Sequence, residues 1–320
     1  MTTQNFPFAE GAFGPFGAPE VPHSFHPGDV QGAVFYVNAN ASGADDVGDP
    51  WPEVDEAICF STLQAAIDAC VDNRGDTIYV KRGGELVTST VLFDKAGIRV
   101  ITQKWGMSPS FRGEFTSIYS TALTGDPTAI ISQPCYIEGL GFVGADTGTS
   151  FFEGAALLLR VDATSSATAA PLGVYLNQCR FPGWSLGNTC GLAMDGGTNV
   201  LIEDCYFEDA AFTHGIYMQG VAGHVQVKDC HFSLGTYAMK TGAFSDAGVN
   251  TQLEFGPGNI CINPTKGINS GSNVVKGIIC GNFFATAVDS THDQTINNME
   301  VDGWMCVGNE YRDEVSVDAD

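Results

Sequence analysis

The chain has few charged side chains, and very few of them are basic. Charged residues make up 16% of its 320 residues, and 14 Lys and Arg stand against 37 Asp and Glu, a formal net charge of −23. Acidity of this size repels phosphate backbones, so we expect no nucleic-acid partner. The charge favours solubility and by itself identifies no partner.

Long apolar runs are also lacking. No segment approaches the roughly 18 uninterrupted apolar residues of a transmembrane helix, so we expect no membrane insertion. The opening MTTQNFPFAEGAFGPFG lacks the basic region and the apolar core of a secretory signal. We therefore expect synthesis in a cytoplasm without a signal peptide. A protein of this kind that works outside the cell would leave by lysis, on a particle, or through an unrecognised route.

Metal-binding motifs are scarce. The 10 cysteines contain no Cys-x-x-Cys pair, which argues against a zinc site of that kind. His23 and His26 form a possible metal pair without further ligands nearby. We therefore expect no metal and no cofactor. The 39 glycines against 14 prolines indicate many tight turns, which favours β over α structure.

Residues 1–32 combine aromatic side chains with proline. Proline at this density prevents a regular helix or a central strand, and exposed aromatic clusters usually mark contacts. We interpret the segment as an extended anchoring arm that orders on a partner surface, with a flexible tail as the alternative. The phenylalanines expected to anchor it are Phe6, Phe8, Phe13, Phe16 and Phe25.

A strand–helix–strand pattern follows the arm. AVFYVNA at 33–39 reads as a strand, and Ser61 with Gln64 reads as a capping box that starts a helix near 62–73. Leu63, Ala66, Ile67 and Cys70 give that helix one apolar stripe. Short strands bounded by turn residues are expected at 76–81, 85–92 and 97–102.

These segments resemble a known family. YVNANASGADD, FSTLQAAIDAC and GDTIYVKRGG are similar to the opening of pectin-lyase-like right-handed parallel β-helix proteins, over about residues 34–102. The resemblance implies an all-β solenoid whose N-terminal end is closed by the amphipathic helix. It implies little about activity.

The second half of the chain repeats. VYLNQCRF at 174–181, VLIEDCYF at 200–207 and VQVKDCHF at 225–232 align without gaps, with a period of about 25 residues. Alternation predicts inward valines and phenylalanines, so Phe181, Phe207 and Phe232 should lie one above another. The period is too short for a propeller blade of about 40 residues. A β-sandwich is the other alternative, and the solenoid is expected over 33–312, with an acidic tail at 313–320.

The cysteines recur at one position of this repeat. Small side chains with a polar tip suit the inside of a tight turn, where they can bond the backbone. We expect buried free thiols in this column and few or no disulfides. The column comprises Cys179, Cys205, Cys230, Asn282 and Asn309. Residues 103–128 and 143–172 exceed a plain coil and are expected to project as loops.

Catalysis is the first candidate function, since enzymes of the resembled family act mostly on polysaccharides. We find no calcium cluster for a lyase, and Thr213-His214-Gly215 departs from the Gly-His-Gly of a polygalacturonase-like hydrolase. Carboxylates on adjacent coils could reach glycosidase separations. The alternative is that these acids are structural, bonding backbone amides in turns or lying on a solvated outer face. The candidate catalytic residues are Asp195, Glu208, Asp209 and His214, with Glu203 and Asp204 nearby.

Arg180, Tyr206 and His231 form an outward column that could bind sugar or protein. A subunit contact or a solvated face is the alternative reading.

Together, the solenoid, the missing secretion signal and the arm resemble a bacteriophage spike, fibre or capsid-decoration protein. That resemblance implies a non-enzymatic virion protein and a homotrimer. The arm would bind capsid or tail proteins, and a host-surface glycan is a candidate ligand of the solenoid. The alternative function is a tailspike depolymerase, a polysaccharide hydrolase or lyase.

Overall fold

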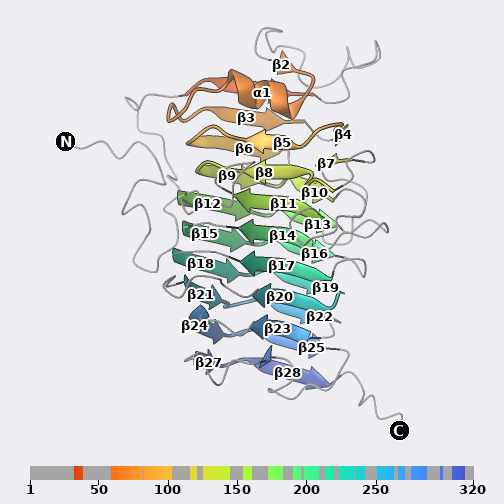
Figure 1. The fold of residues 1–320 in the computed structure, drawn as a ribbon, viewed down its shortest axis with the longest axis vertical. Helices are drawn as coiled ribbons and strands as arrows, with labels where there is room; N and C mark the ends of the chain where they lie inside the picture. Colours follow the sequence, from red (N-terminus) through yellow and green to blue (C-terminus); the bar gives the residue numbers. More distant parts are fainter. Residues whose placement is uncertain are drawn as a thin grey trace, which may run out of the picture.

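Three parallel β-sheets run side by side along the molecule, and the chain adds one strand to each sheet in turn (Figure 1). This computed structural model is a right-handed parallel β-helix, and it confirms the fold expected from the resemblance over residues 34–102. The structure describes residues 32–38, 59–81, 83–102, 116–120, 125–144, 154–160, 172–182, 190–195, 198–208, 213–219, 223–233, 235–241, 251–262, 266–270, 275–286, 296–297 and 305–313. The anchoring arm, Asp209 and the acidic tail beyond residue 313 lie outside these ranges.

The strands are short, and each sheet is named here by its size. The 11-stranded sheet contains β1 (Val34–Val37), β2 (Cys59–Phe60), β3 (Thr77–Val80), β6 (Ile98–Thr102), β9 (Cys135–Glu138), β12 (Leu172–Asn177), β15 (Thr198–Glu203), β18 (Gly223–Lys228), β21 (Thr251–Phe255), β24 (Val275–Cys280) and β27 (Met305–Val307). The 9-stranded sheet contains β4 (Gly84–Leu86), β7 (Ser117–Tyr119), β10 (Gly141–Val143), β13 (Arg180–Pro182), β16 (Tyr206–Glu208), β19 (His231–Ser233), β22 (Ile260–Ile262), β25 (Phe283–Thr286) and β28 (Glu310–Asp313). The 8-stranded sheet contains β5 (Val91–Phe93), β8 (Ala129–Ile131), β11 (Ala155–Arg160), β14 (Cys190–Asp195), β17 (His214–Gln219), β20 (Tyr237–Thr241), β23 (Lys266–Ser270) and β26 (Ile296–Asn297).

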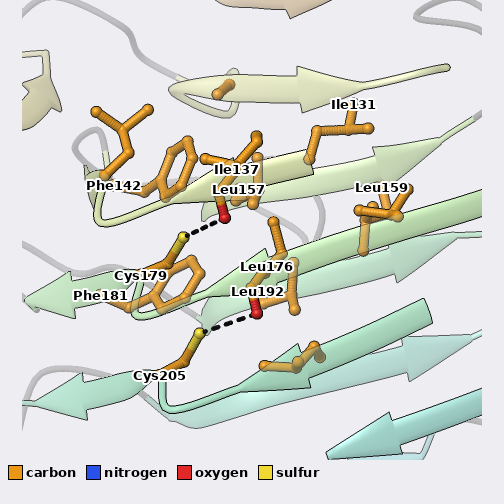
Figure 2. Close-up of a cluster of buried hydrophobic side chains, with 14 of the residues drawn as sticks. Ile131, Ile137, Phe142, Leu157, Leu159, Leu176, Cys179, Phe181, Leu192 and Cys205 are labelled. Atoms are coloured by element: carbon orange, nitrogen blue, oxygen red, sulfur yellow. Dashed lines mark hydrogen bonds between the residues drawn. The ribbon is translucent and has the colours of Figure 1, made fainter. Parts of the chain in front are cut away.

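The predicted phenylalanine column is confirmed. Phe181, Phe207 and Phe232 pair in register on β13, β16 and β19. Their rings stack at centroid distances of 4.5 and 4.7 Å and are almost fully buried. Val174, Val200 and Val225 form a second inward column on the 11-stranded sheet. Like side chains therefore meet on successive coils and fill the narrow core (Figure 2).

The cysteine column forms a ladder of side-chain hydrogen bonds. The thiols of Cys179 and Cys205 lie 3.6 Å from carbonyl oxygens of the preceding coil, those of Ile137 and Leu176 (Figure 2). The Cys230 thiol lies 3.6 Å from the Ile202 carbonyl oxygen in the same way. The side-chain amides of Asn259, Asn282 and Asn309 continue the ladder with donations of 2.9 Å to Val227, Phe255 and Ile279. All 10 cysteines of the chain are free thiols.

A left-handed residue precedes each rung of the ladder. Gln178, Asp204 and Asp229 have φ of 53°, 53° and 54°, and Gly281 and Gly308 take over the same position in later coils. Asp tolerates this backbone region better than most residues, and Gly adopts it without strain. The turn therefore explains why Asp, Gln or Gly stands directly before Cys or Asn in the repeat.

The single described helix, α1 (Leu63–Ala69), lies at the N-terminal end of the solenoid (Figure 1). Its predicted apolar stripe is buried against the first coils. The expected capping box is wrong by one residue, because the N-cap is Thr62, whose hydroxyl accepts from the Ala65 amide at 3.2 Å. Gln64 instead accepts from the Leu92 amide of β5 at 2.7 Å.

The helix also ends earlier than the expected 73. Cys70 is already extended, with ψ of 155°. The carboxylate of Asp76 then accepts from the Val71 amide at 2.8 Å and from the Ala33 amide at 2.7 Å. This fully buried carboxylate directs the chain out of the helix and ties the cap to the first strand.

Two segments expected to project as loops contain strands of the solenoid. β7 lies within 103–128, and β11 lies within 143–172. β7 pairs with β4 and β10, and β11 pairs with β8 and β14. These strands lack the Cys-x-Phe signature of the clear repeats, so the sequence pattern did not reveal them.

Candidate functional site

The predicted binding column lies on the outer face of the 9-stranded sheet. Arg180, Tyr206 and His231 pair in register on consecutive coils, so the structure brings these three side chains together. The rings of Tyr206 and His231 lie 6.0 Å apart and are tilted by 44°. Burial lowers the pKa of His231 below its ordinary value, and the nearby Glu208 carboxylate opposes that shift. The column thus presents a cation, a phenol and a largely neutral imidazole.

Glu208 lies beside this column and forms an ion pair with it. The Arg180 guanidinium donates to Glu208 Oε2 from Nε at 3.0 Å and from Nη2 at 2.5 Å. The pair joins β13 to β16, and both side chains are mostly buried, with 14% and 26% exposed. The guanidinium donates twice to one carboxylate oxygen, a geometry that suits a positioning or binding role.

Asp195 lies on a different sheet. It ends β14 of the 8-stranded sheet, and Arg160 at the end of β11 is its register partner. Nη2 of Arg160 lies 2.7 Å from Asp195 Oδ2, and Nε lies 3.0 Å from it. Asp195 and Glu208 are thus on separate faces of the solenoid, each paired with an arginine of the preceding coil.

His214 begins β17 and is buried, with 1% exposed. Its ring contacts two tyrosine rings, edge-on to Tyr217 at 5.6 Å and tilted against Tyr237 at 5.3 Å. Tyr237 occupies the same register position one coil later. An imidazole enclosed in this way contributes to packing, and its catalytic role stays a prediction. Asp209 and the five anchoring phenylalanines lie outside the described residues.

The sequence reasoning missed a polar network on the outer face of the 11-stranded sheet. Tyr136 donates its hydroxyl to Glu138, and Tyr175 donates to Glu203 on the next coil. The Lys228 ammonium lies 2.7 Å from the other oxygen of Glu203. Burial, reinforced by the acceptor carboxylates, raises the pKa of both tyrosines above the ordinary value. The sequence contains a pattern that could have predicted this network, because outward positions of neighbouring repeats carry Tyr175, Glu203 and Lys228.

This network encloses a small apolar cluster. Tyr136, Tyr175 and Leu201 are 5%, 7% and 2% exposed although they point away from the core. The rings of the two tyrosines meet edge to face at 5.0 Å. Since these groups are covered, the network holds coils together and offers little surface to a ligand.

Among the residues that the structure describes, no group of three or more His, Cys, Asp or Glu side chains could hold a metal ion. No described helix is long and apolar enough to cross a membrane. The outward column on the 9-stranded sheet is the best candidate surface for a ligand.

Comparison with known proteins finds similar structures only at low sequence identity. No protein-family model matches the chain, and no curated protein matches it. A pectin methylesterase from Aspergillus niger in deglycosylated form aligns with a TM-score of 0.46 and 12% identity, over 92% of this chain and 88% of the enzyme. A penultimately deglycosylated form of that enzyme gives a TM-score of 0.38 at 12% identity over the same shares.

A viral protein aligns over less of its length. ORF18 of Geobacillus virus E2 gives a TM-score of 0.27 and 14% identity, over 71% of this chain and 50% of that protein. The parallel strand pairing and the stacked inward columns of this chain are what assign it to the pectin-lyase-like right-handed β-helix fold.

Proposed function

We propose that the chain is a non-enzymatic structural protein of a virion, a spike, fibre or capsid decoration. Residues 1–32 would anchor it to capsid or tail proteins, and the solenoid would project and contact a host-surface glycan. The proposal depends chiefly on one observation. The acids best placed for catalysis, Asp195 and Glu208, form ion pairs with arginines of the preceding coil.

These pairs suit a stiff projecting rod. Each links two coils of a solenoid that is elongated along its axis (Figure 1). Repeat architectures gain stability mainly from contacts between neighbouring units, so charge pairs between coils reinforce the stack. A rod of this kind places its outward columns far from its attachment point. The column of Arg180, Tyr206 and His231 would then be the glycan-contacting surface.

The virion role can be tested on particles from a lysate of the source organism. Particles are banded on a density gradient, and the chain is quantified in the band by mass spectrometry. Enrichment with capsid or tail proteins is expected, and absence from every particle fraction would overturn the proposal. Serine in place of Phe6, Phe8, Phe13, Phe16 and Phe25 should abolish incorporation, whereas Leu86→Ser, at an exposed position of the rod, should leave it unchanged.

A polysaccharide depolymerase is the second candidate, and one observation favours it. Asp195 and Arg160 lie together at the end of two adjacent strands with 17% and 22% of their side chains exposed, so a substrate could reach them. Purified protein is incubated with a panel of acidic and neutral glycans, and new reducing ends are counted. Fragment release that Asp195→Asn or Glu208→Gln abolishes would replace the structural proposal, and no release supports it.

A further inference from the structure

The strands β16 and β19 lie next to each other in the 9-stranded sheet (Figure 1), and four of their outward side chains form a polar square. Tyr206 pairs in register with His231. Glu208 pairs with Ser233 in the same way, and all four side chains are partly exposed. Adjacent strands lie about 4.8 Å apart and alternate residues of a strand about 6.6 Å apart, so one small molecule can contact all four. We call this set the β16–β19 square.

The single carboxylate of the square is paired with a cation. Arg180, one coil earlier, donates to Glu208 from both Nε and Nη2, and both donations reach Oε2. The other carboxylate oxygen, Oε1, accepts no hydrogen bond from a residue that the structure describes. An ionised oxygen is a stronger acceptor than a neutral one. Glu208 can therefore accept from a ligand hydroxyl while the guanidinium balances its charge.

The other three side chains of the square offer hydrogen bonds without charge. The hydroxyls of Tyr206 and Ser233 can each donate and accept, and neither bonds another residue of the described ranges. His231 forms no ion pair with a described acid, and because burial lowers its pKa, its imidazole is mostly neutral near pH 7. The two rings, 6.0 Å apart, add apolar surface. The square therefore suits a ligand with several hydroxyl groups and apolar C–H faces, as in a sugar ring.

Carboxylates flank the square where its two strands begin. Asp204 and Asp229 occupy the left-handed turn positions two residues before Tyr206 and His231. After burial, the charge of Asp204 is the next cause of the raised pKa of Tyr206, so this carboxylate acts on the square. Arg180 is the single Lys or Arg in the described strands β10, β13, β16, β19 and β22. An anionic ligand would therefore meet two carboxylates and a cation that is already paired, on a chain of net charge −23.

We propose that the β16–β19 square binds an uncharged sugar through its hydroxyl groups and excludes anionic glycans. This assignment rests on the proposed glycan contact of the outer column and specifies which class of glycan the column takes. A sugar hydroxyl donates to Oε1 of Glu208, and neighbouring hydroxyls bond Tyr206 and Ser233. A cationic amino sugar is less suitable, because the carboxylate within the square is already neutralised by Arg180.

Isothermal titration of the full chain with sugars that differ in charge tests the proposal. The probes are oligomers of the galactose and glucose series in three forms: neutral hexoses with their N-acetylhexosamines, uronates, and hexosamines. A neutral member should bind, with an affinity that changes less than about twofold between about 0.1 M and about 1 M salt. A preference for uronates or hexosamines that weakens with salt would overturn the proposal and leave the glycan contact standing. Binding of no probe would remove the glycan contact itself, and the proposal with it.

Two variants that each remove one hydroxyl locate the ligand. Tyr206→Phe and Ser233→Ala should each lower the affinity for the neutral sugar about threefold to tenfold. The control is Leu86→Ser, at an exposed position on β4 of the same sheet, which should bind as the native chain does. Circular dichroism checks folding. Native affinity in both hydroxyl variants, or an equal loss in the control, would overturn the assignment to the square.

A change of charge tests the exclusion of anions. Glu208→Gln releases the Arg180 guanidinium, so the affinity for uronates relative to neutral sugars should rise at least about fivefold. Glu254→Gln is the matched control, because it removes the same charge from the 11-stranded sheet and should leave this ratio unchanged. An equal rise in both variants, or none in Glu208→Gln, would overturn the proposal. If Glu208→Gln fails to fold, Arg180→Met replaces it, and the affinity for hexosamines should rise instead.

Discussion

Arg180 reaches across one coil of the solenoid to bind Glu208, with its Nε 3.0 Å and its Nη2 2.5 Å from the same carboxylate oxygen. Arg180 belongs to the outer column on the 9-stranded sheet, and Glu208 lies beside that column. The contact makes Glu208 a structural partner of the proposed binding surface, and it can be measured separately from any activity.

A double-mutant cycle with Arg180→Met and Glu208→Gln should give a coupling energy of about 1 kcal/mol, since the pair is mostly buried and bidentate on the arginine side. The free energy of unfolding is taken from urea denaturation of the two single variants and the double variant. A coupling of zero would mean that the two side chains contribute independently, contrary to the observed contact.

Asp76→Ala should destabilise the N-terminal cap by about 2–4 kcal/mol. The buried carboxylate accepts from the amides of Ala33 and Val71 and from the guanidinium of Arg74. Its removal leaves the two partly buried amides of Ala33 and Val71 without this acceptor. Hydrogen exchange of α1 and β1 should report the loss first. The control is Asp94→Ala, at an exposed position before β6. It should change the free energy of unfolding by less than about 0.5 kcal/mol.

The hydrogen-bond ladder predicts that Asn can replace Cys without loss of stability, whereas Cys cannot replace Asn. Cys205→Asn should leave stability within about 1 kcal/mol or raise it, because an amide at this position in later coils bonds the equivalent carbonyl at 2.9 Å. Asn282→Cys should lose about 1–2 kcal/mol, since a thiol replaces a strong donor. The midpoints of urea denaturation of both variants test this prediction. A large loss in Cys205→Asn would show that the thiol is needed for packing alone.

Glu85 should make stability depend on pH. Burial raises its pKa above the ordinary value, although the amide of Leu63 donates to the carboxylate and opposes the shift. The protonated acid is therefore favoured in the folded chain. Its contribution to stability is present below the unfolded pKa and is lost as pH rises through the folded pKa.

Thermal unfolding from acid to neutral pH checks this, with Glu85→Gln as the variant. The amide keeps an acceptor for Leu63 and removes the ionisation, so the stability of the variant relative to the native chain should increase as pH rises. Glu310→Gln, at an exposed carboxylate on β28, serves as the control. A constant difference between Glu85→Gln and the native chain at all pH values would contradict the assignment.

The sequence predicted the parts of the fold that depend on local repetition. Phe181, Phe207 and Phe232 recur with one spacing, and in a solenoid equal spacing means equal position in space. The helix N-cap was misplaced by one residue, because Ser61 and Thr62 are chemically alike and the choice depends on how Gln64 meets β5. β7 and β11 were missed because long insertions separate them from the repeat pattern.

The candidate site was less predictable. Arg180, Tyr206 and His231 were expected in one column, and their register agrees. The pairing of Glu208 with Arg180 and of Asp195 with Arg160 could not be read from spacing. Each depends on the offset between coils, which varies with the lengths of the segments between β11 and β12 and between β13 and β14. Their functional roles remain predictions for the experiments above.

The exchange of thiols for amides along the ladder has a mechanical consequence. A thiol holds only the coil before it, whereas Asn259 and Asn309 also accept an amide of the preceding rung, from Cys230 and Asn282 at 2.9 and 3.1 Å. Peeling away a C-terminal coil must therefore break two side-chain bonds where an inner coil offers one. Under tension along the axis, the terminal coils would resist unwinding more strongly than the cysteine-bearing middle.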